Sequence, residues 1–315
     1  MKRLKKFVSP ALLVLAALIW GLAFSAQKSA EAVPPFTLGA ARSVFAFAFL
    51  TVVIIIGDKI TKNGRRLFSK RGIDLTRVEI IGGIICGAVL AIASFFQQLG
   101  MNEGTDAGKS AFITALYVVI VPIYGIALKR RAPLNVWISM PFAVVGFYLL
   151  CIKEGFYIAP SDVFVIICAL IFPIHILAID RFSPSSDGVR MSAVQFLSAA
   201  VINAILALIF ESPVEFGAIS DSLGAVIYLG IGSSGIAYTL QIIGQRGTNP
   251  AAASILLSLE SVFGVLGAAV ILSEKLLLRE YIGCAIVFVA VLISELDLGA
   301  LLKKIKAKNE KEVTE

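Results

Sequence analysis

Long apolar runs constrain this chain more than any other feature of its sequence. The runs are about 18–22 residues long and are separated by short polar breaks. A helix of about 20 residues spans the hydrocarbon core of a bilayer, so runs of this length predict transmembrane helices. Backbone groups in hydrocarbon must bond internally, and the alternating pattern of barrel strands is absent, which favours helices. Ten segments fit, at residues 8–27, 35–56, 78–98, 106–127, 134–152, 160–180, 190–210, 221–243, 249–272 and 276–296.

The composition agrees with a membrane protein. Hydrophobic residues make up 58% of the chain and charged residues 16%, against about 25% charged residues in a typical soluble protein. These values exclude a disordered chain and an ordinary soluble enzyme. The four cysteines lie in or beside apolar runs, so we expect small apolar fillers rather than disulfides or metal ligands. The net charge of +7 gathers between the runs, which favours a lipid bilayer and not nucleic acid as the partner.

The distribution of basic residues predicts the orientation. With ten spans, 22 of the 28 lysines and arginines fall on the side that holds both termini, and five fall on the other side. The remaining one, Arg42, lies inside a span. The positive-inside rule then places both termini in the cytoplasm of a multi-pass protein of the cell membrane.

The two halves of the chain follow the same order of polar and apolar positions. A shift of 143 residues carries Gln98 to Gln241, Gly104 to Gly247, Thr105 to Thr248, Leu116 to Leu259 and Tyr117 to Glu260. An odd number of spans per half makes the halves enter the membrane from opposite sides, as in many transporters. We therefore expect an all-α membrane protein with ten transmembrane helices as two inverted five-helix repeats. The units are residues 1–152 and 160–297, followed by a cytoplasmic tail, 298–315.

Three stretches carry a family resemblance. They are ALIWGLAFSAQK from Ala17, followed by Arg42 in the second span, QQLGMNEGTDAGKSAFITALYVVIVPIYGIAL from Gln97, and the region from Tyr228 to Leu296. These stretches resemble EamA-type transporters of the drug/metabolite transporter superfamily, and the resemblance covers nearly the whole chain. One departure is Ser261 after Glu260, where proline is common in the family, so the ninth helix is expected to be less kinked here.

The resemblance implies a secondary transporter that exports a small metabolite. An amino acid or a related amphipathic compound is the expected substrate, carried by alternating access around a central cavity. No Walker loop occurs, so no nucleotide motor and no cofactor are expected, and the chain is not expected to be an enzyme. An intramembrane enzyme acting on a lipid or peptide, or a flippase for lipids or precursors, are the alternatives. The sequence leaves substrate identity, direction, coupling ion and oligomeric state open.

Polar residues inside spans are the candidate site residues, because buried polar groups in a membrane are costly. Arg42 is interpreted either as a structural anchor or as the contact for an anionic substrate. Glu260, near the middle of the ninth span, either fixes helix packing or takes part in substrate or proton coupling, with Tyr117 as its repeat mate. His175 is the only histidine, which excludes a histidine metal site and leaves packing or substrate binding.

Amides and aromatic residues complete the candidate set. Gln98, Gln195 and Gln241 either form hydrogen bonds between helices or bind substrate. Trp20, Phe95 and Tyr238 are candidates for the lining of an amphipathic cavity.

Two patterns of small residues are interpreted as packing features. The run from Gly232 to Gly235, with two serines between, imitates a protease motif, but it is expected to permit close helix approach or bending. The spaced Gly83 and Gly87, continuing to Ala91, predict a packing stripe, either within the chain or in a dimer.

Overall fold

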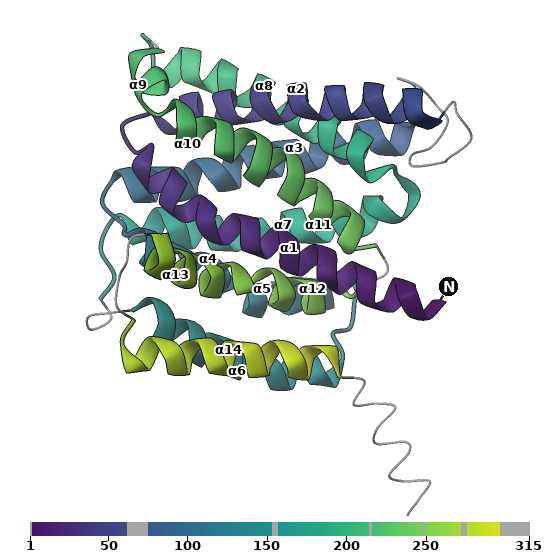
Figure 1. Ribbon diagram of the computed structural model, residues 1–315, viewed down its shortest axis with the longest axis vertical. Helices are drawn as coiled ribbons and strands as arrows, with labels where there is room; N and C mark the ends of the chain where they lie inside the picture. The colour runs from purple at the N-terminus through teal and green to yellow at the C-terminus, as the bar shows by residue number, and fades with distance from the viewer. Residues whose placement is uncertain are drawn as a thin grey trace, which may run out of the picture.

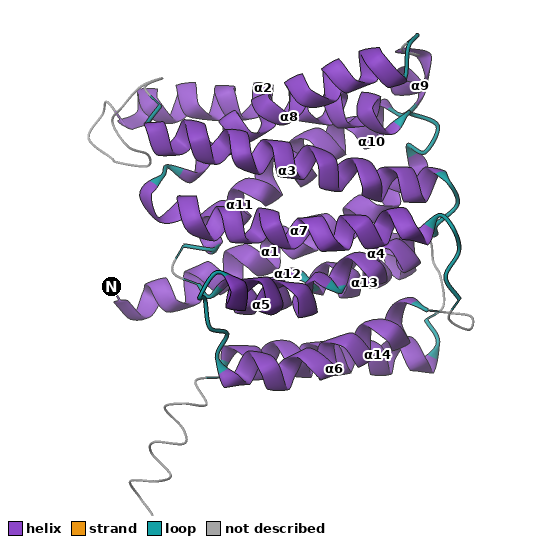
Figure 2. Cartoon of the chain, turned by 180° about the vertical axis from the view of Figure 1, so that it is seen from behind, coloured by secondary structure: helices purple, strands orange, loops and turns teal. Residues whose placement is uncertain are grey.

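The computed structural model is a bundle of helices that run roughly alongside one another (Figures 1 and 2). It describes residues 2–61, 75–152, 157–213, 216–246, 248–271 and 276–296, and these residues contain no strand. The helices of the first half are α1 (Lys2–Ser29), α2 (Pro35–Thr61), α3 (Arg77–Asn102), α4 (Ala107–Ala115), α5 (Tyr117–Ala127) and α6 (Leu134–Cys151). Those of the second half are α7 (Asp162–Phe182), η1 (Ser183–Ser185), α8 (Gly188–Phe210), α9 (Phe216–Asp221), α10 (Leu223–Ile227), η2 (Tyr228–Ala237), α11 (Tyr238–Gly244), α12 (Pro250–Leu257), α13 (Leu259–Ile271) and α14 (Leu278–Glu295).

Nine helical stretches of the described chain are long and apolar enough to cross a membrane. They are Val8–Ser29, Pro35–Asp58, Arg77–Asn102, Ala107–Ala127, Leu134–Cys151, Asp162–Ser185, Gly188–Phe210, Leu223–Gly244 and Pro250–Gly267. Each corresponds to one of the first nine predicted segments, so the prediction of a multi-pass helical membrane protein is confirmed. The tenth predicted segment forms α14, whose 18 residues include the charged Arg279, Glu280 and Glu295.

The helices are arranged in layers along the long axis of the molecule. In Figure 1, α2 and α8 form one end of the stack and α6 and α14 form the other. Between them, α3 packs against α7 and α8, and α1 packs against α13 and η2. The centre of the bundle is thus built from helices of both halves, and the elements that surround it are α1, α3, α7, η2 and the interrupted helices α4–α5 and α12–α13.

Polar residues fasten the two ends of the α2–α8 pair. At the start of α2, the Glu211 carboxylate accepts hydrogen bonds from the backbone nitrogens of Phe36 (2.8 Å) and Thr37 (2.7 Å). These nitrogens belong to the first turn, which has no partners within its own helix. At the other end, the Arg190 Nη2 of α8 donates to both Asp58 oxygens of α2, at 2.8 and 3.0 Å.

Two spans are interrupted at equivalent places. The α4–α5 break lies at Leu116 and the α12–α13 break lies at Ser258. At each break a backbone nitrogen bonds three residues back: Val119 to Leu116 (3.0 Å) and Ser261 to Ser258 (3.1 Å). Such tightened turns interrupt the regular ladder of an α-helix. The first residues after the breaks, including Tyr117 and Glu260, are thereby placed in the middle of the bundle.

The small-residue run in the eighth span lies in η2, a wide π-helical stretch. A Cβ atom added to Gly230 would lie 2.5 Å from the Phe45 Cβ of α2, and one added to Gly235 would lie 2.8 Å from the Phe49 ring. The predicted close approach of helices and the predicted irregularity of this span are therefore confirmed. π-Helical turns of this kind are frequent at functional sites.

The predicted packing stripe of α3 faces the inside of the molecule. Cβ atoms added to Gly83 and Gly87 would lie 2.6 Å from the Val194 side chain and 2.3 Å from the Gln195 carbonyl oxygen of α8. The stripe thus packs within the chain. Cys86, Cys151, Cys168 and Cys284 are free thiols buried in the bundle, as the sequence predicts.

Several sequence predictions fall on residues that the structure does not describe. They concern most of the basic stretch between the second and third spans (62–74), Gly247 of the repeat alignment, and the predicted cytoplasmic tail (298–315).

Candidate functional site

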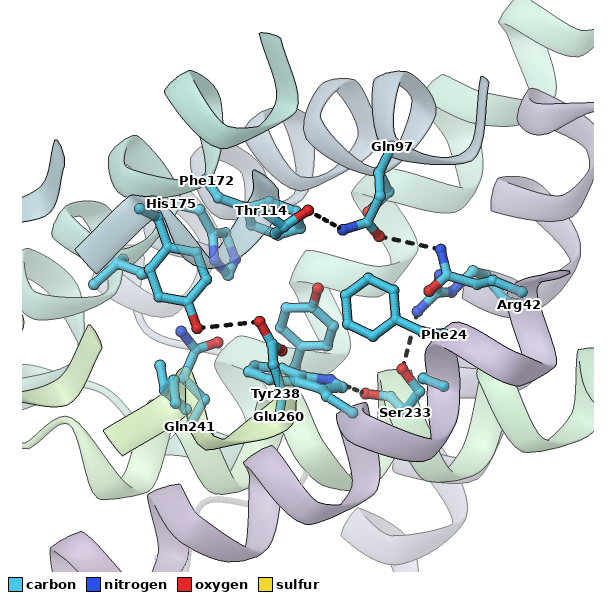
Figure 3. Close-up of a pocket in the computed structure, with 17 residues that line it drawn as sticks. Phe24, Arg42, Gln97, Thr114, Phe172, His175, Ser233, Tyr238, Gln241 and Glu260 are labelled. Atoms are coloured by element: carbon cyan, nitrogen blue, oxygen red, sulfur yellow. Dashed lines mark hydrogen bonds between the residues drawn. The ribbon is translucent and has the colours of Figure 1, made fainter. Parts of the chain in front are cut away.

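A cavity lies where the helices of the two halves meet (Figure 3). It encloses about 530 Å³ of space unoccupied by atoms, its opening included. Sites for small ligands commonly combine apolar walls with a few polar groups. Side chains from α1, α2, α3, α4, α5, α7, η2, α11, α12 and α13 line it, so both predicted repeat units contribute.

Arg42 of α2 lines one side of the cavity. Its Nε donates to the Ser234 Oγ at 3.0 Å and its Nη2 donates to the Ser233 Oγ at 3.1 Å, both from η2. The side chain is 9% exposed, and no carboxylate lies within 4.0 Å of it among the described residues. A guanidinium group has five N–H donors, so two serine hydroxyls leave donors over for another acceptor. Arg42 is therefore a buried charge held in place by neutral partners.

Glu260 and Tyr117 meet on another side of the cavity. The Tyr117 Oη donates to the Glu260 Oε1 at 3.2 Å across 143 residues of sequence. Both side chains are buried, at 4% and 6% exposure, and each stands in the first turn after a helix break. The two residues that the repeat alignment pairs are thus in direct contact. The cavity wall thus holds a carboxyl group and a phenol hydroxyl side by side.

A row of ring contacts runs along the cavity wall from the serines that bind Arg42 to His175. The Trp20 Nε1 of α1 donates to the Ser233 carbonyl oxygen at 3.0 Å, beside the hydroxyl that binds Arg42. The Trp20 ring lies 4.6 Å from the Tyr238 ring, centroid to centroid. Tyr238 in turn meets the edge of His175, with centroids 5.6 Å apart. All of these side chains line the cavity.

A chain of amides surrounds the part of the cavity next to α3. The Gln27 Nε2 donates to the Oε1 atoms of Gln97 (3.1 Å) and Gln98 (3.3 Å), and the Gln97 Nε2 donates to the Thr114 Oγ1 at 3.0 Å. Gln27, Gln97 and Thr114 line the cavity, whereas Gln98 turns away and binds Asn102 at 2.7 Å. These bonds link α1, α3 and α4 and hold the amides in one orientation.

Seven of the ten predicted site residues line the cavity: Trp20, Arg42, Tyr117, His175, Tyr238, Gln241 and Glu260. Three do not. Phe95 stacks on Phe36 at the α2–α3 contact, with ring centroids 4.0 Å apart, and Gln98 belongs to the amide network. The Gln195 Oε1 bonds the His175 Nε2 at 3.2 Å, so Gln195 touches a lining residue from behind.

Sequence reasoning did not single out several lining residues as site residues. Gln27, Gln97 and Thr114 form the amide network, and Ser233 holds Arg42. A signal existed for two of them, because polar amides near the ends of apolar runs were candidates, and Gln97 adjoins the chosen Gln98. Within the described part of the chain, no group of three histidine, cysteine or acidic residues could hold a metal ion.

Comparison with known proteins agrees with this architecture. A protein of Archaeoglobus fulgidus named as an uncharacterized transporter is 28% identical over 294 residues, covering 90% of this chain and 84% of its own. A second uncharacterized transporter of that organism is 23% identical and covers 92% and 98%. One crystal structure of a protein superposes with a TM-score of 0.72 at 21% identity, covering 91% of this chain and 96% of its own, which shows a shared fold.

The family comparison covers both halves of the chain. The EamA-like transporter family matches residues 9–152 and, a second time, residues 159–296. The two matches include every described residue that lines the cavity. This chain is therefore a multi-pass membrane protein that belongs to the EamA-like transporter family.

Proposed function

We propose that this protein is a secondary transporter that exports a small zwitterionic metabolite, such as an amino acid, across the cell membrane. Membership in a transporter family and a cavity shared by both halves support transport of a small molecule. The observation that carries the proposal is Arg42, a buried cation in the cavity whose partners are two serine hydroxyls.

The chemistry of the cavity suits a molecule with two opposite charges. The fork of a guanidinium matches a carboxylate, which Arg42 would bind with the donors that the serines leave over. Glu260 would face the ammonium group, because it is the acidic residue of the cavity lining. The rings of Trp20 and Tyr238 add faces that attract a cation and cover apolar parts of the substrate.

Alternating access would require two units that rock against one another. We propose that these units are residues 1–152 and 160–297, each of five spans in inverted orientation, with α14 as the tenth span and both termini in the cytoplasm. The helix contacts support this proposal, because replacing each helix by its equivalent in the other half gives a contact that is also present. The α3–α7 contact becomes the contact of η2 and α11 with α1, and the α3–α8 contact becomes the η2–α2 contact. α6 on α14 and α2 on α8 correspond to themselves.

Individual residues support the same exchange. The starts of α2 (Pro35) and α8 (Gly188) are 153 residues apart. In this pair of helices, a shift of 153 residues carries Thr37 to Arg190 and Asp58 to Glu211. The structure contains both resulting contacts, Glu211 with Thr37 (2.8 Å) and Asp58 with Arg190 (2.8 Å). Two equivalent contacts at opposite ends of the α2–α8 pair are what an inverted repeat would produce.

Flux measurements test the proposed function. Purified protein in liposomes is expected to exchange radiolabelled amino acids across the bilayer, whereas empty liposomes are not. Flux should fall in the Arg42→Gln variant, which removes the charge but keeps hydrogen-bonding groups. Absence of exchange for every amino acid tested, with protein that is folded and correctly inserted, would contradict the proposal.

Glu260→Gln tests proton coupling. The change keeps the shape and the hydrogen bond to Tyr117 but removes the titrating group. If Glu260 couples transport to protons, uptake driven by a pH gradient should disappear while substrate exchange is partly kept. Glu280→Gln is a matched control, because Glu280 is also a buried acid (2% exposed) but caps α14 away from the cavity. Wild-type transport by the Glu260 variant at every pH would remove Glu260 from the mechanism.

Labelling tests the orientation. Single cysteines that replace Glu103 or Pro213 should react with a membrane-impermeant thiol reagent added to intact cells. Cysteines that replace Lys70 or Lys308 should react only after the cells are permeabilised. External reactivity of the Lys308 position would overturn either the number of spans or their direction.

A further inference from the structure

Three buried side chains beside the cavity have polar atoms without a hydrogen-bond partner. These atoms are the Nδ1 of His175, the Nε2 of Gln195 and the Oε1 of Gln241. His175 and Gln195 are fully buried, and Gln241 is 2% exposed. A buried polar atom without a partner costs about 1–3 kcal/mol, so such atoms are uncommon and call for an explanation. His175 and Gln241 line the cavity and Gln195 is bonded to His175, so this group points to a ligand that supplies the missing bonds.

The three side chains form one polar group. His175 and Gln241 line the cavity, and Gln195 holds the His175 ring from behind through the 3.2 Å bond to Nε2. Because the Gln195 Oε1 only accepts, Nε2 of the neutral ring carries the hydrogen and Nδ1 is an acceptor. The Gln241 Oε1 is also an acceptor. The group therefore offers the cavity two acceptors, one from each of the two lining residues, while Gln195 holds the His175 ring in place.

This group lies across the cavity from Arg42. Figure 3 shows Arg42 on one side and His175 and Gln241 on the other, with Phe24 and Tyr238 between them. Arg42 is bound by serines of η2, whereas His175 of α7 contacts the Tyr238 ring of α11. A substrate whose carboxylate lies on Arg42 would thus place its other end near His175 and Gln241.

We propose that His175, Gln195 and Gln241 form a second subsite that binds a neutral hydrogen-bonding group of the substrate, a hydroxyl or a carboxamide. The inference rests on the proposed function and narrows it to metabolites that are polar at both ends. A hydroxyl or a carboxamide can donate to Nδ1 and to the Gln241 Oε1. The three side chains bring no formal charge when His175 is neutral, so an uncharged group fits them better than a charged one.

A pair of substrates with the same shape isolates this interaction. Threonine and valine differ by a hydroxyl in place of a methyl group, and both carry the carboxylate and ammonium groups of the proposed substrate. A site built to hydrogen-bond a hydroxyl discriminates against the analogue that lacks it, because its own polar groups then stay unpaired. We expect liposomes with the wild-type protein to exchange labelled threonine at least about tenfold better than labelled valine.

Substitution of Gln241 should remove the preference. Gln241→Met keeps the length of the side chain without its polar atoms, and the threonine to valine ratio should fall to about one. Gln245→Met is the matched control: Gln245 is 1% exposed and also has an unpartnered Oε1, but it lies outside the cavity and donates to the Ile176 oxygen at 3.2 Å. The control should keep the wild-type ratio. If Gln241→Met does not fold, His175→Met provides the same comparison from α7.

The outcomes separate the two proposals. Equal exchange of threonine and valine by the wild-type protein would overturn the subsite and leave the proposed transport intact. An unchanged threonine preference in folded Gln241→Met and His175→Met variants would also overturn it. Absence of exchange for both amino acids and for all others tested would overturn the proposed function, and the subsite with it.

Discussion

Two buried arginines of this protein have opposite surroundings. Arg190 at the start of α8 is 1% exposed, and its guanidinium binds Asp58 at 2.8 Å and Asp187 at 3.4 Å. Arg42 in α2 is 9% exposed, and within the described part of the chain its guanidinium binds the hydroxyls of Ser233 and Ser234. The same side chain thus serves two purposes. Arg190 has its charge balanced by two carboxylates, whereas we propose that the charge of Arg42 serves a ligand.

The location of each arginine agrees with this difference. Arg190 fastens the end of α2 to the loop before α8, where Asp187 also caps α8 through the backbone nitrogens of Val189 (3.0 Å) and Arg190 (3.2 Å). The Asp187 backbone nitrogen also donates to the Glu79 Oε1 of α3 at 2.8 Å. Arg246, in the loop after α11, donates to the Ser186 oxygen at 2.5 Å, and burial lowers its pKa although Asp187 and Glu79 act against this. Charged side chains therefore connect α2, α3, α8 and the loop after α11 at this end of the bundle.

The largest expected effect is a loss of stability in Arg190→Met. The change leaves Asp58 and Asp187 without their cation, and breaking a buried ion pair costs about 3–5 kcal/mol. Because Asp58 is 20% exposed, the lower part of this range is expected. The free energy of unfolding, measured by titration with SDS in mixed micelles, should fall by about 3 kcal/mol. In contrast, Arg42→Met should leave the free energy of unfolding nearly unchanged. Equal losses in the two variants would contradict the difference in charge balance between the two arginines.

A second expected effect concerns transport by Arg42→Lys. Lysine keeps the positive charge but lacks the planar fork that binds a carboxylate through two parallel bonds. Hydrogen bonds to charged groups contribute about 1.5–3 kcal/mol, so the loss of one should reduce kcat/KM at least about tenfold. Arg190→Lys is the matched control and should lose stability but keep most of its transport per folded molecule. Wild-type kinetics of Arg42→Lys in liposomes would show that Arg42 is a structural anchor.

The smallest expected effect is that of Ser234→Ala. The variant removes the neutral hydroxyl that accepts a hydrogen bond from the Arg42 Nε at 3.0 Å. The positive charge of Arg42 remains. A loss of about 1 kcal/mol corresponds to a reduction of about fivefold in kcat/KM. Ser254→Ala serves as the control, because the Ser254 Oγ donates to the Ala251 oxygen of its own helix at 2.8 Å. Equal kinetics of the two variants would indicate that the serines do not position Arg42.

Much of the fold could be predicted because its signals are local. The lengths of the apolar runs predicted the nine stretches that can cross a membrane, and the ninth segment, predicted from residue 249, begins in the structure at Pro250. Arg42 and Glu260 were recognisable as candidate site residues, because charged groups inside apolar runs are rare and costly. The repeat alignment put Tyr117 and Glu260 at equivalent positions, but their contact came from the structure.

The sequence by itself determined the membrane-spanning helices and the rare polar residues within them, because hydropathy and charge act over neighbouring residues. Only the tertiary structure decided which polar neighbours face the cavity. Gln97 and Gln98 differ by one position, which is about 100° around a helix. Gln27 of α1 bonds both, but only Gln97 points to Thr114 of α4 and the cavity. Likewise, the serines that hold Arg42 lie 191 and 192 residues away in a π-helical stretch, and no local pattern reveals such a distant partner.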